Sequence, residues 1–271
     1  MYIEFYWLMH GRADLIEESM SIIQSFGPAK NANLPKVRAR AFDDDKDGAI
    51  PIEDVLSPKQ EAHLRKIATV LEFGDNNNTV FCQSEDAHFA YAVATGLVRV
   101  SRHFANGHRQ TLAFMFPGDL FGLPHQGQYI NFAQAVCPSK LYRIPWQQWT
   151  SMMRDKPGMQ GMLRLLVAFD LWRAQRRMMI LGEQNPTQKL ATVLLGFAQH
   201  GEFYDARRRL LALPISRFDL GDYMDIAPET VVRTLAKLEK SRFIRRLSPR
   251  LIEIKDLEPL WRLARQGLPN H

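Results

Sequence analysis

The stretch LPISRFDLGDYMDIAPETVVRTLAKLEKSRFIRRLSPRLIEIKD, residues 213–256, decides the fold of the C-terminal part of this 271-residue chain. Ser216 followed by Asp219 three residues later has the pattern of a capping box, which predicts a helix over 217–224. A second helix is predicted over 228–241, because proline suits its first position and apolar residues then recur at helical spacing. Three residues join the two helices, and this spacing predicts a helix-turn-helix.

A close helix crossing and a short hairpin complete the predicted unit. Gly221 is expected at the point where the two helices cross. Beyond the second helix, the runs FIRRL and LIEIK flank the turn pair Ser248 and Pro249 and predict a two-stranded wing. The core between the helices is expected to contain Leu220, Met224, Ile226 and Val231.

Basic residues concentrate in the same stretch. Between Ile226 and Lys255 there are eight basic and three acidic residues, so this segment carries a net charge of +5, against +6 for the whole chain. Such a concentration of positive charge indicates a surface that binds a polyanion, and duplex DNA is the polyanion that suits a helix-turn-helix.

Glu229 and Arg233 lie one turn apart at the start of the second predicted helix, so they face the same side. In a major groove Arg233 can donate to O6 and N7 of guanine, Glu229 can accept from N4 of cytosine, and Val232 suits a thymine methyl. The pair also fits an ordinary ion pair on a helix surface, but the capped first helix, tight turn and basic wing favour base reading. Phosphate contacts are expected from Ser216, Arg217, Thr230, Lys237, Arg242, Arg245, Arg246 and Arg250.

Short runs rich in β-branched and aromatic residues follow one another between Thr69 and Trp149, separated by turn residues. This spacing predicts an all-β sandwich or roll, with its clearest hairpin at Asn106-Gly107. Just upstream, 57–70 has a serine N-cap, a proline and helical apolar spacing, which predicts a short amphipathic helix. The sequence therefore predicts an α+β chain, with a roll followed by the helix-turn-helix.

Residues 158–183 form a predicted long helix with more apolar residues than one face can hide. A second copy could cover the excess about a two-fold axis, although the stripe could equally cover the sheet of its own domain. The predicted dimer interface consists of Met162, Leu165, Phe169, Trp172, Arg176 and Met179. The expected domains are a loose N-terminal extension (1–52), the roll (53–157), the dimerisation helix (158–183) and the winged helix-turn-helix domain (184–271), the last beginning with a helix that ends at Gly201.

At this point the sequence resembles the Crp/Fnr family of regulators. TGLVRVSRHFANGHRQTLAFMFPGDLFGL, residues 95–123, is similar to the family's sensor roll, and residues 213–240 are similar to its DNA-reading helices. The resemblance implies a roll like the cyclic-nucleotide-binding domain, with a cupin-like jelly-roll topology, and a homodimer on palindromic DNA that contacts RNA polymerase. It also places Glu229 and Arg233 on the base-reading positions of the family motif.

Three departures from the family pattern carry expectations of their own. Val232 stands where the motif usually has Ser or Gly, and Asp225 stands where the turn commonly has Gly. Leu123 replaces the Glu that follows Phe-Gly in nucleotide-binding members, and the Arg of their phosphate-binding segment is missing. A buried cyclic phosphate without a cation is heavily penalised, so the sequence predicts a roll that does not bind cyclic nucleotide.

The sequence predicts no cofactor, metal site or catalytic residue. Two cysteines, Cys82 and Cys137, cannot supply the four thiolates of an iron-sulfur centre. Haem stays an alternative, with His88, His103, His108, His125 or one of the two cysteines as the iron ligand. DDDKDGAIPIED at 43–54 resembles a calcium-binding loop but has Asp at its last position and an internal Pro, which favours a solvated linker. Without a signal peptide or a membrane-length apolar run, a reduced cytoplasmic protein that is not an enzyme is expected.

Overall fold

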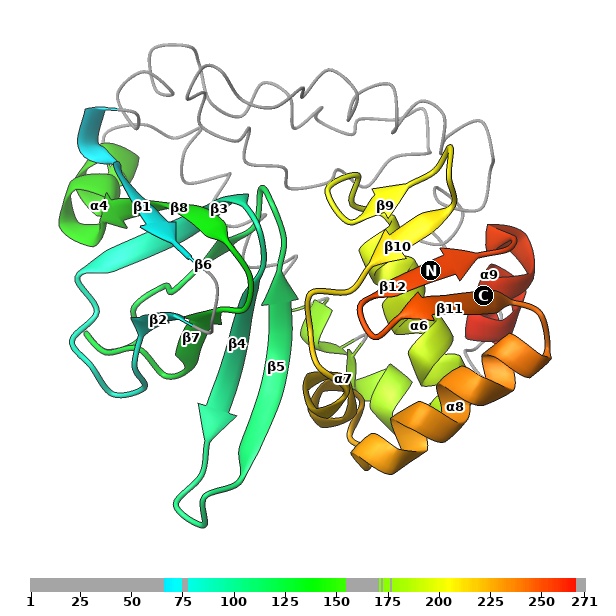
Figure 1. Cartoon of the computed structure of the whole chain (residues 1–271). Coiled ribbons are helices and arrows are strands. Elements are labelled where there is room, and N and C mark those ends of the chain that lie inside the picture. Colours follow the sequence, from blue (N-terminus) through cyan, green and yellow to red (C-terminus); the bar gives the residue numbers. More distant parts are fainter. Residues whose placement is uncertain (1–65, 75–77, 155–170, 172, 176, 267–271) are drawn as a thin grey trace, which may run out of the picture. The chain divides into compact units, whose positions relative to one another are not determined.

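The structure, a computed structural model, describes residues 66–74, 78–154, 171, 173–175 and 177–266. These residues divide into two units, which we call the roll and the winged unit (Figure 1). The roll extends to Leu171, and the winged unit contains the described residues after it. The N-terminal extension, the calcium-loop-like segment and most of the predicted long helix lie outside the described residues.

Two antiparallel four-stranded sheets form the roll (Figure 1). The first contains, in spatial order, β1 (Thr69–Phe73), β8 (Ser139–Pro145), β3 (Phe89–Thr95) and β6 (Leu120–Phe121). The second contains β2 (Asn78–Phe81), β7 (Phe132–Ala135), β4 (Val98–His103) and β5 (Arg109–Met115). The predicted roll is confirmed, and a helix, α4 (Trp146–Arg154), follows it.

The core between the sheets is built around an aromatic cluster. Four rings, those of Phe81, Tyr91, Phe121 and Tyr129, lie with neighbouring centroids 3.9 to 6.4 Å apart. Gly122 is packed tightly against this cluster, because a Cβ there would lie 2.9 Å from Cε1 of Phe81. The aromatic cluster therefore occupies the middle of the roll with closely packed apolar surface.

The predicted Asn106-Gly107 hairpin is confirmed between β4 and β5. The amide of Phe104 donates to the carbonyl of His108 over 2.9 Å, and the amide of Gly107 donates to the carbonyl of Phe104 over 2.9 Å. Gly107 has φ +79, a left-handed conformation that closes a three-residue loop without a Cβ penalty.

One sequence prediction in the roll is wrong. Thr69 and Val70 were expected in the helix over 57–70, but they begin β1 and pair with Arg143 and Tyr142 of β8. Both are β-branched, and five residue pairs with β8 outweigh their weak helical preference. Residues 57–65 lie outside the described part of the chain.

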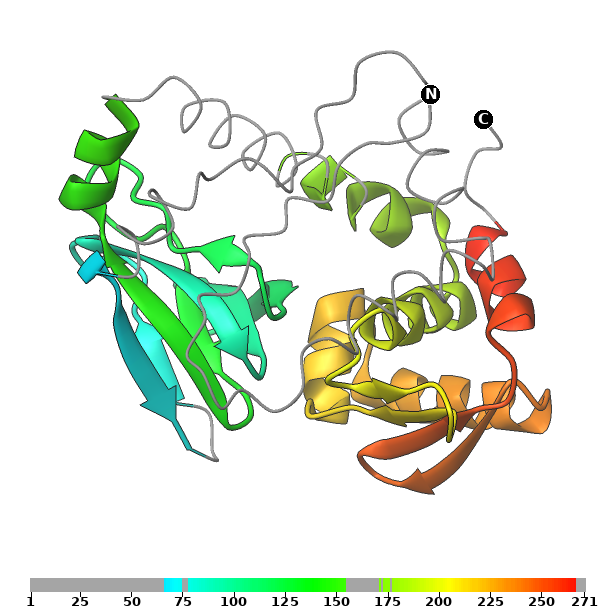
Figure 2. The same ribbon diagram turned by 90° about the horizontal axis from the view of Figure 1, so that it is seen from above.

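The winged unit contains α6 (Pro186–Ala198), whose N-cap Asn185 forms a capping box with Gln188. This helix ends three residues before the predicted Gly201: the His200 amide bonds to the Phe197 carbonyl, three residues back, so the α-helical bonding stops there. A four-stranded sheet contains, in order, β11 (Ile244–Ser248), β12 (Leu251–Ile254), β10 (Leu210–Ala212) and β9 (Tyr204–Asp205). The helix α6 packs against α8 (Pro228–Lys240) and α9 (Leu257–Arg265), as Figure 2 shows.

A helix that ends at Glu183 leads into α6, and we call its described residues the linking helix (171, 173–175 and 177–183). Leu171 and Met178 on it are 59% and 72% exposed, whereas Met179 of the predicted dimer interface is half-buried. The other predicted interface residues, Met162, Leu165, Phe169, Trp172 and Arg176, lie outside the described residues. Among the helices that the structure describes, none is long and apolar enough to cross a membrane.

Candidate nucleic-acid interface

The first helix of the predicted helix-turn-helix, α7, spans Arg217–Met224 as the sequence predicts. Its capping box is formed in both directions: Ser216 Oγ accepts from the Asp219 amide over 3.0 Å, and the Asp219 carboxylate accepts from the Ser216 amide over 3.2 Å. Two otherwise unpaired amides at the helix start are thereby satisfied, which fixes where α7 begins.

The turn between the helices depends on Gly221 and Asp225. The carbonyl of Gly221 accepts from the amides of Asp225 and Ile226, the latter over 3.0 Å. A Cβ at Gly221 would lie 2.6 Å from the Ile226 carbonyl oxygen, so the predicted close crossing is confirmed. Asp225 adopts φ 54 and ψ 53, the left-handed conformation for which family turns use glycine.

Asp225→Gly is expected to raise the free energy of unfolding by about 0.5–1 kcal/mol, because glycine takes the left-handed backbone without a Cβ clash. The measurement is the denaturant midpoint of the full chain. Asp222→Gly is the matched control, since Asp222 lies in the right-handed interior of α7, where glycine should destabilise the helix. Equal losses from both changes would contradict the account of the turn.

The second helix, α8, presents two different faces. Val231, Leu235 and Leu238 are buried, and Leu220 and Met224 of α7 are buried with them. Ile226, also predicted in this core, is half-buried. The three residues predicted to read bases, Glu229, Val232 and Arg233, are exposed together at the start of the helix, and 47% of Val232 is accessible. An apolar side chain of this size left on the outer face is available to a partner.

Thr230 lies between the two predicted base-reading charges and contacts one of them. Its hydroxyl accepts from Nη2 of Arg233 over 3.0 Å, and its carbonyl accepts from the Thr234 hydroxyl over 2.7 Å. The Arg233 guanidinium is therefore held along the helix rather than extended freely. The sequence predicted Thr230 as a phosphate ligand; in the structure its hydroxyl positions Arg233.

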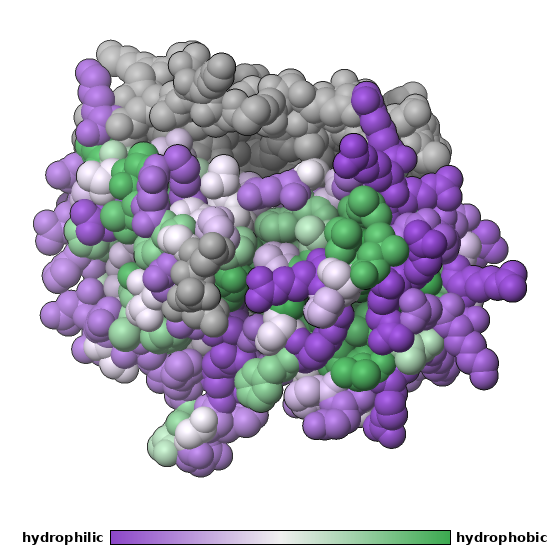
Figure 3. All heavy atoms as spheres, viewed as in Figure 1, coloured by the Kyte–Doolittle hydropathy of each residue, from purple (hydrophilic) through white to green (hydrophobic). Residues whose placement is uncertain are grey.

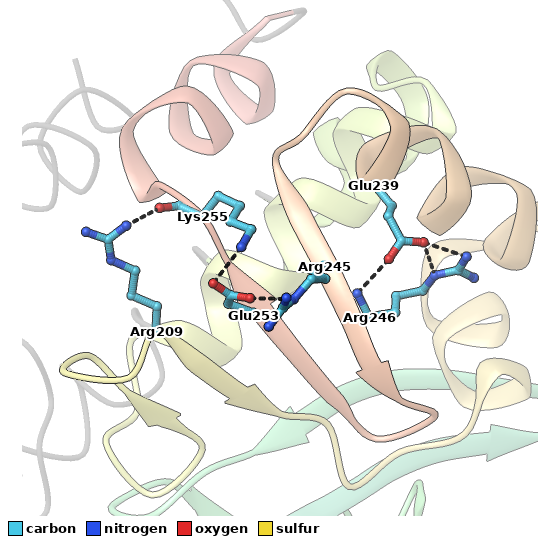
Figure 4. Close-up of polar contacts among 6 residues, drawn as sticks. All are labelled: Arg209, Glu239, Arg245, Arg246, Glu253 and Lys255. Carbon is cyan, nitrogen blue, oxygen red and sulfur yellow. Dashed lines mark hydrogen bonds and ion pairs between the residues drawn. The ribbon is translucent and has the colours of Figure 1, made fainter.

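Two carboxylates pair with the basic residues of the wing (Figure 4). Glu239, near the end of α8, accepts from the Arg246 amide over 2.8 Å, from its Nε over 2.8 Å and from its Nη2 over 2.7 Å. Glu253 on β12 forms an ion pair with Arg245, whose Nε lies 2.8 Å from Oε2, and its Oε1 accepts from Lys255 Nζ over 2.7 Å. The hydrogen bonds from Arg246 hold the pKa of Glu239 below its ordinary value. The pKa of Glu253 is also lowered, and the largest cause is the hydrogen bond from Lys255.

Residue pairing across the wing hairpin could have indicated one of these contacts. Arg245 is directly opposite Glu253 in the β11–β12 register, which shifts by one residue between Arg246 and Ser248. The Glu239–Arg246 contact requires the wing to fold back onto α8, and no sequence spacing indicates that. A further arginine, Arg209, donates to the Lys255 carbonyl over 2.7 Å and ties the β9–β10 turn to the end of β12 (Figure 4).

Arg217 connects α7 to the tip of the wing. Its Nη2 donates to the Pro249 carbonyl over 2.7 Å, and the side chain is half-buried. Burial lowers the pKa of Arg217, and the positive charge of Arg246 lowers it further. Its neighbour Ser216 uses its hydroxyl in the capping box. Both were predicted to bind phosphate, and both already have roles that hold the unit together.

Three of the predicted phosphate ligands remain available. Lys237, Arg242 and Arg250 are exposed and form no ion pair with any described residue. Arg242 has φ 61 and follows α8 in a Schellman motif, with its amide bonded to the Glu239 carbonyl and the Phe243 amide to that of Leu238. Hydrophilic side chains cover most of the visible face of this unit around α8 and the wing (Figure 3).

Salt dependence should separate the free wing charges from the paired ones. Arg250→Gln is expected to reduce the slope of log K against log salt by about 0.9, the value for one lost phosphate contact. The double change Glu239→Gln and Arg246→Gln removes one charge of each sign and should leave the slope unchanged. Fluorescence anisotropy with duplex DNA between about 50 and 200 mM salt measures both. A slope that falls equally in both proteins would mean that Arg246 leaves Glu239 and binds phosphate.

The roll has a different environment where related rolls hold a cyclic phosphate. Leu123 packs against the apolar cluster that includes Trp149. The segment 122–131 contains no Arg or Lys. Of the buried or half-buried arginines on nearby strands, Arg99 donates to Gln134, and Arg143 donates to Thr69 and lies over the Phe89 ring, 4.5 Å from its centroid.

Several histidines and cysteines of the roll contact aromatic or polar neighbours. His103 stacks on Phe132 with ring centroids 4.7 Å apart, and His108 lies against Phe104. Burial first, and then Glu85, raise the pKa of the Cys82 thiol. Within the described part of the chain, no three His, Cys, Asp or Glu side chains converge into a group able to hold a metal ion.

Comparison with known proteins gives two matching domain families, in order along the chain. Residues 75–156 match the cyclic nucleotide-binding domain, and residues 188–263 match the Crp-like helix-turn-helix domain. The nitrogen fixation regulation protein FixK of Azorhizobium caulinodans is 30% identical over 188 residues, which cover 69% of this chain and 76% of FixK. The transcriptional activatory protein AadR of Rhodopseudomonas palustris is 26% identical over 192 residues, 70% of this chain and 79% of AadR.

Solved structures are also similar to this chain. FixK2 from Bradyrhizobium japonicum matches with a TM-score of 0.67 and 27% identity, and the match covers 73% of this chain and 97% of FixK2. A CooA mutant from Carboxydothermus hydrogenoformans matches with a TM-score of 0.61 at 17% identity, a likeness of fold alone.

Proposed function

Because the chain belongs to the Crp/Fnr family of transcription regulators, with a helix-turn-helix DNA-binding domain, we propose that it acts as a homodimer on palindromic DNA and reads each half-site with Glu229, Val232 and Arg233. The observation that carries this proposal is the joint exposure of these three side chains at the start of α8, on the face opposite its buried residues. Its partners are duplex DNA, a second copy of the chain and RNA polymerase, in the cytoplasm.

The chemistry of the three side chains defines what each subunit reads. Arg233 donates two hydrogen bonds to one guanine, Glu229 accepts from a cytosine amino group, and Val232 contacts a thymine methyl. Lys237, Arg242 and Arg250 bind phosphates around them and fix the register without reading sequence. Val232 has no hydroxyl, so the base that it contacts is selected by shape and apolar contact rather than by a hydrogen bond.

The exposed residues of the linking helix support a dimer seam that differs from the predicted stripe. Leu171, Ala174 and Met178 are exposed and follow the three-then-four spacing of a two-helix seam, whereas Met179 is half-buried. We place Met178 in the seam and Met179 beside it. Pairing of linking helices would bury the two large apolar side chains that the single chain leaves exposed.

Met178→Glu is expected to raise the dimer dissociation constant by about two orders of magnitude, because the two-fold axis brings two carboxylates together in an apolar seam. Gln175→Glu is the control: it adds the same charge at an exposed polar position of the same helix. Sedimentation equilibrium measures both. Two variants that dimerise equally well would place the seam elsewhere.

The roll is proposed not to bind cyclic nucleotide. A cyclic phosphate at the segment 122–131 would find no cation in that segment. Titration calorimetry with cAMP and cGMP tests this, with no binding heat expected. Micromolar affinity for either nucleotide would contradict it.

Selection of bound sequences from random duplex DNA, followed by footprinting, tests the central proposal. The expected motif is a palindrome whose half-site centres lie about 34 Å apart, one turn of DNA, with guanine and cytosine at the positions facing α8. Enrichment of DNA without any shared sequence would show a non-specific DNA-binding protein instead. Selection of a single, unrepeated half-site would support base reading by α8 and contradict binding as a dimer.

A further inference from the structure

Arg177 of the linking helix contacts the helix-turn-helix at one defined place. Its Nη2 donates to the Tyr223 carbonyl over 3.0 Å, and its guanidinium lies over the Tyr223 ring, 4.3 Å from the ring centroid. Tyr223 lies in the last turn of α7, where helix carbonyls lack an intrahelical partner. Arg177 thus supplies a donor and a positive charge to the C-terminal end of α7, both of which stabilise that end.

A second attachment lies seven residues further along. Gln184, directly after the linking helix, is buried, and its Nε2 donates to the Ala264 carbonyl of α9 over 2.6 Å. Its Oε1 accepts from the Thr192 hydroxyl of α6 over 3.1 Å. A buried amide with both ends bonded is costly to release, so Gln184 fixes the end of the linking helix to the winged unit.

A single attachment fixes the position of one point on the linking helix, whereas two attachments also fix the direction of the helix axis. Arg177 and Gln184 are separated by about 10 Å along a helix axis. Gln184 alone would leave the linking helix free to pivot, and Arg177 removes that freedom by holding the helix against α7. The crossing at Gly221 then holds α8 against α7, because it leaves no space for even a methyl group.

From this chain of contacts we infer that Arg177 is a positioning residue that sets the spacing between the two DNA-reading helices of the dimer. The inference rests on the proposed homodimer, in which the linking helices meet at the two-fold axis. Arg177 fixes the angle between that axis and α8 through Tyr223, so it selects which half-site separation the dimer accepts. It does not select the bases within a half-site, because its side chain is engaged with α7.

The test compares palindromes with identical half-sites at the selected separation and at separations one base pair longer and shorter. Each added base pair moves one half-site by about 3.4 Å and turns it by about 35° around the DNA. In Arg177→Met, the ratio of affinities for the selected and altered separations should fall about tenfold, as expected when a charge-assisted contact that holds the angle is lost. Arg177→Lys, which keeps the charge but not the flat stacking group, should give a smaller fall.

Arg262→Met is the matched control, an arginine exposed on α9 whose ion pair with Glu258 lies at the surface. It should leave the spacing ratio unchanged. The base preference within each half-site should be the same in all four proteins. Should Arg177→Met fail to fold by circular dichroism, the lysine variant decides the question. An unchanged spacing ratio in folded Arg177 variants would overturn the inference.

The outcomes separate this inference from the proposed function. A wild-type protein without any base preference contradicts base reading by α8. A wild-type protein that reads half-sites but accepts every separation equally keeps base reading and overturns the inference. A reduced spacing ratio with intact base preference supports both.

Discussion

Gly221→Ala is expected to lower the free energy of unfolding by about 2–3 kcal/mol and to abolish specific DNA binding. The added methyl group would lie 2.6 Å from the Ile226 carbonyl oxygen, a backbone atom that no side-chain rotation can move away. Either α7 and α8 separate or the turn at Asp225 distorts, and both displace the start of α8. The measurements are denaturant unfolding and binding to the selected palindrome.

Gly196→Ala gives the matched control. Gly196 lies in α6, and an added Cβ there meets nothing within 4 Å. Alanine at that helical position should raise the free energy of unfolding by about 0.5–1 kcal/mol and leave DNA binding intact. If the two alanines behaved alike, the close crossing would not be what positions α8.

Arg233→Ala is expected to cost about 1–3 kcal/mol on the selected palindrome and to relax the preference for one guanine in each half-site. Nonspecific DNA should be bound almost as before, because the exposed Lys237, Arg242 and Arg250 remain. Competition between the palindrome and variants substituted at each base gives the preference directly. If Arg233→Ala lost the same affinity for specific and random DNA, Arg233 would be a phosphate ligand and not a base-reading residue.

Arg233→Lys serves as a companion to this experiment. Lysine keeps the charge but cannot make the two-pronged contact with guanine or the same hydrogen bond to Thr230. It should therefore keep the nonspecific affinity of the unchanged protein and lose most of the guanine preference. A lysine variant with full preference would show that charge alone is read at that base.

The helix-turn-helix could be predicted almost residue by residue because its signals are local. A capping box at Ser216, a proline at the start of α8 and a glycine at the crossing each determine the backbone at their own position. The outward placement of Glu229 and Arg233 follows from helical periodicity alone. Asp225 shows that even the left-handed turn was readable, since aspartate tolerates that conformation.

Other elements could not be predicted, because their signals are tertiary. The strands β6 and β9 have two residues each, too few for any periodicity, and α4 and α9 were not distinguished from the apolar runs around them. Thr69 and Val70 fit a helical pattern in the sequence, but in the structure they pair with β8. At the interface, Arg246 was predicted to bind phosphate, because only the folded wing brings Glu239 within hydrogen-bond distance of it.

The Glu239 carboxylate also protects the exposed edge of the wing sheet from pairing with another strand. β11 is the outermost strand of its sheet, and outer strands present backbone amides to which a stray chain can add. Glu239 occupies the Arg246 amide, and Arg245 and Arg246 place two charged side chains on the strand. A second wing on a neighbouring DNA site would therefore find the Arg246 amide already bonded, which disfavours joining of the two wing sheets along β11.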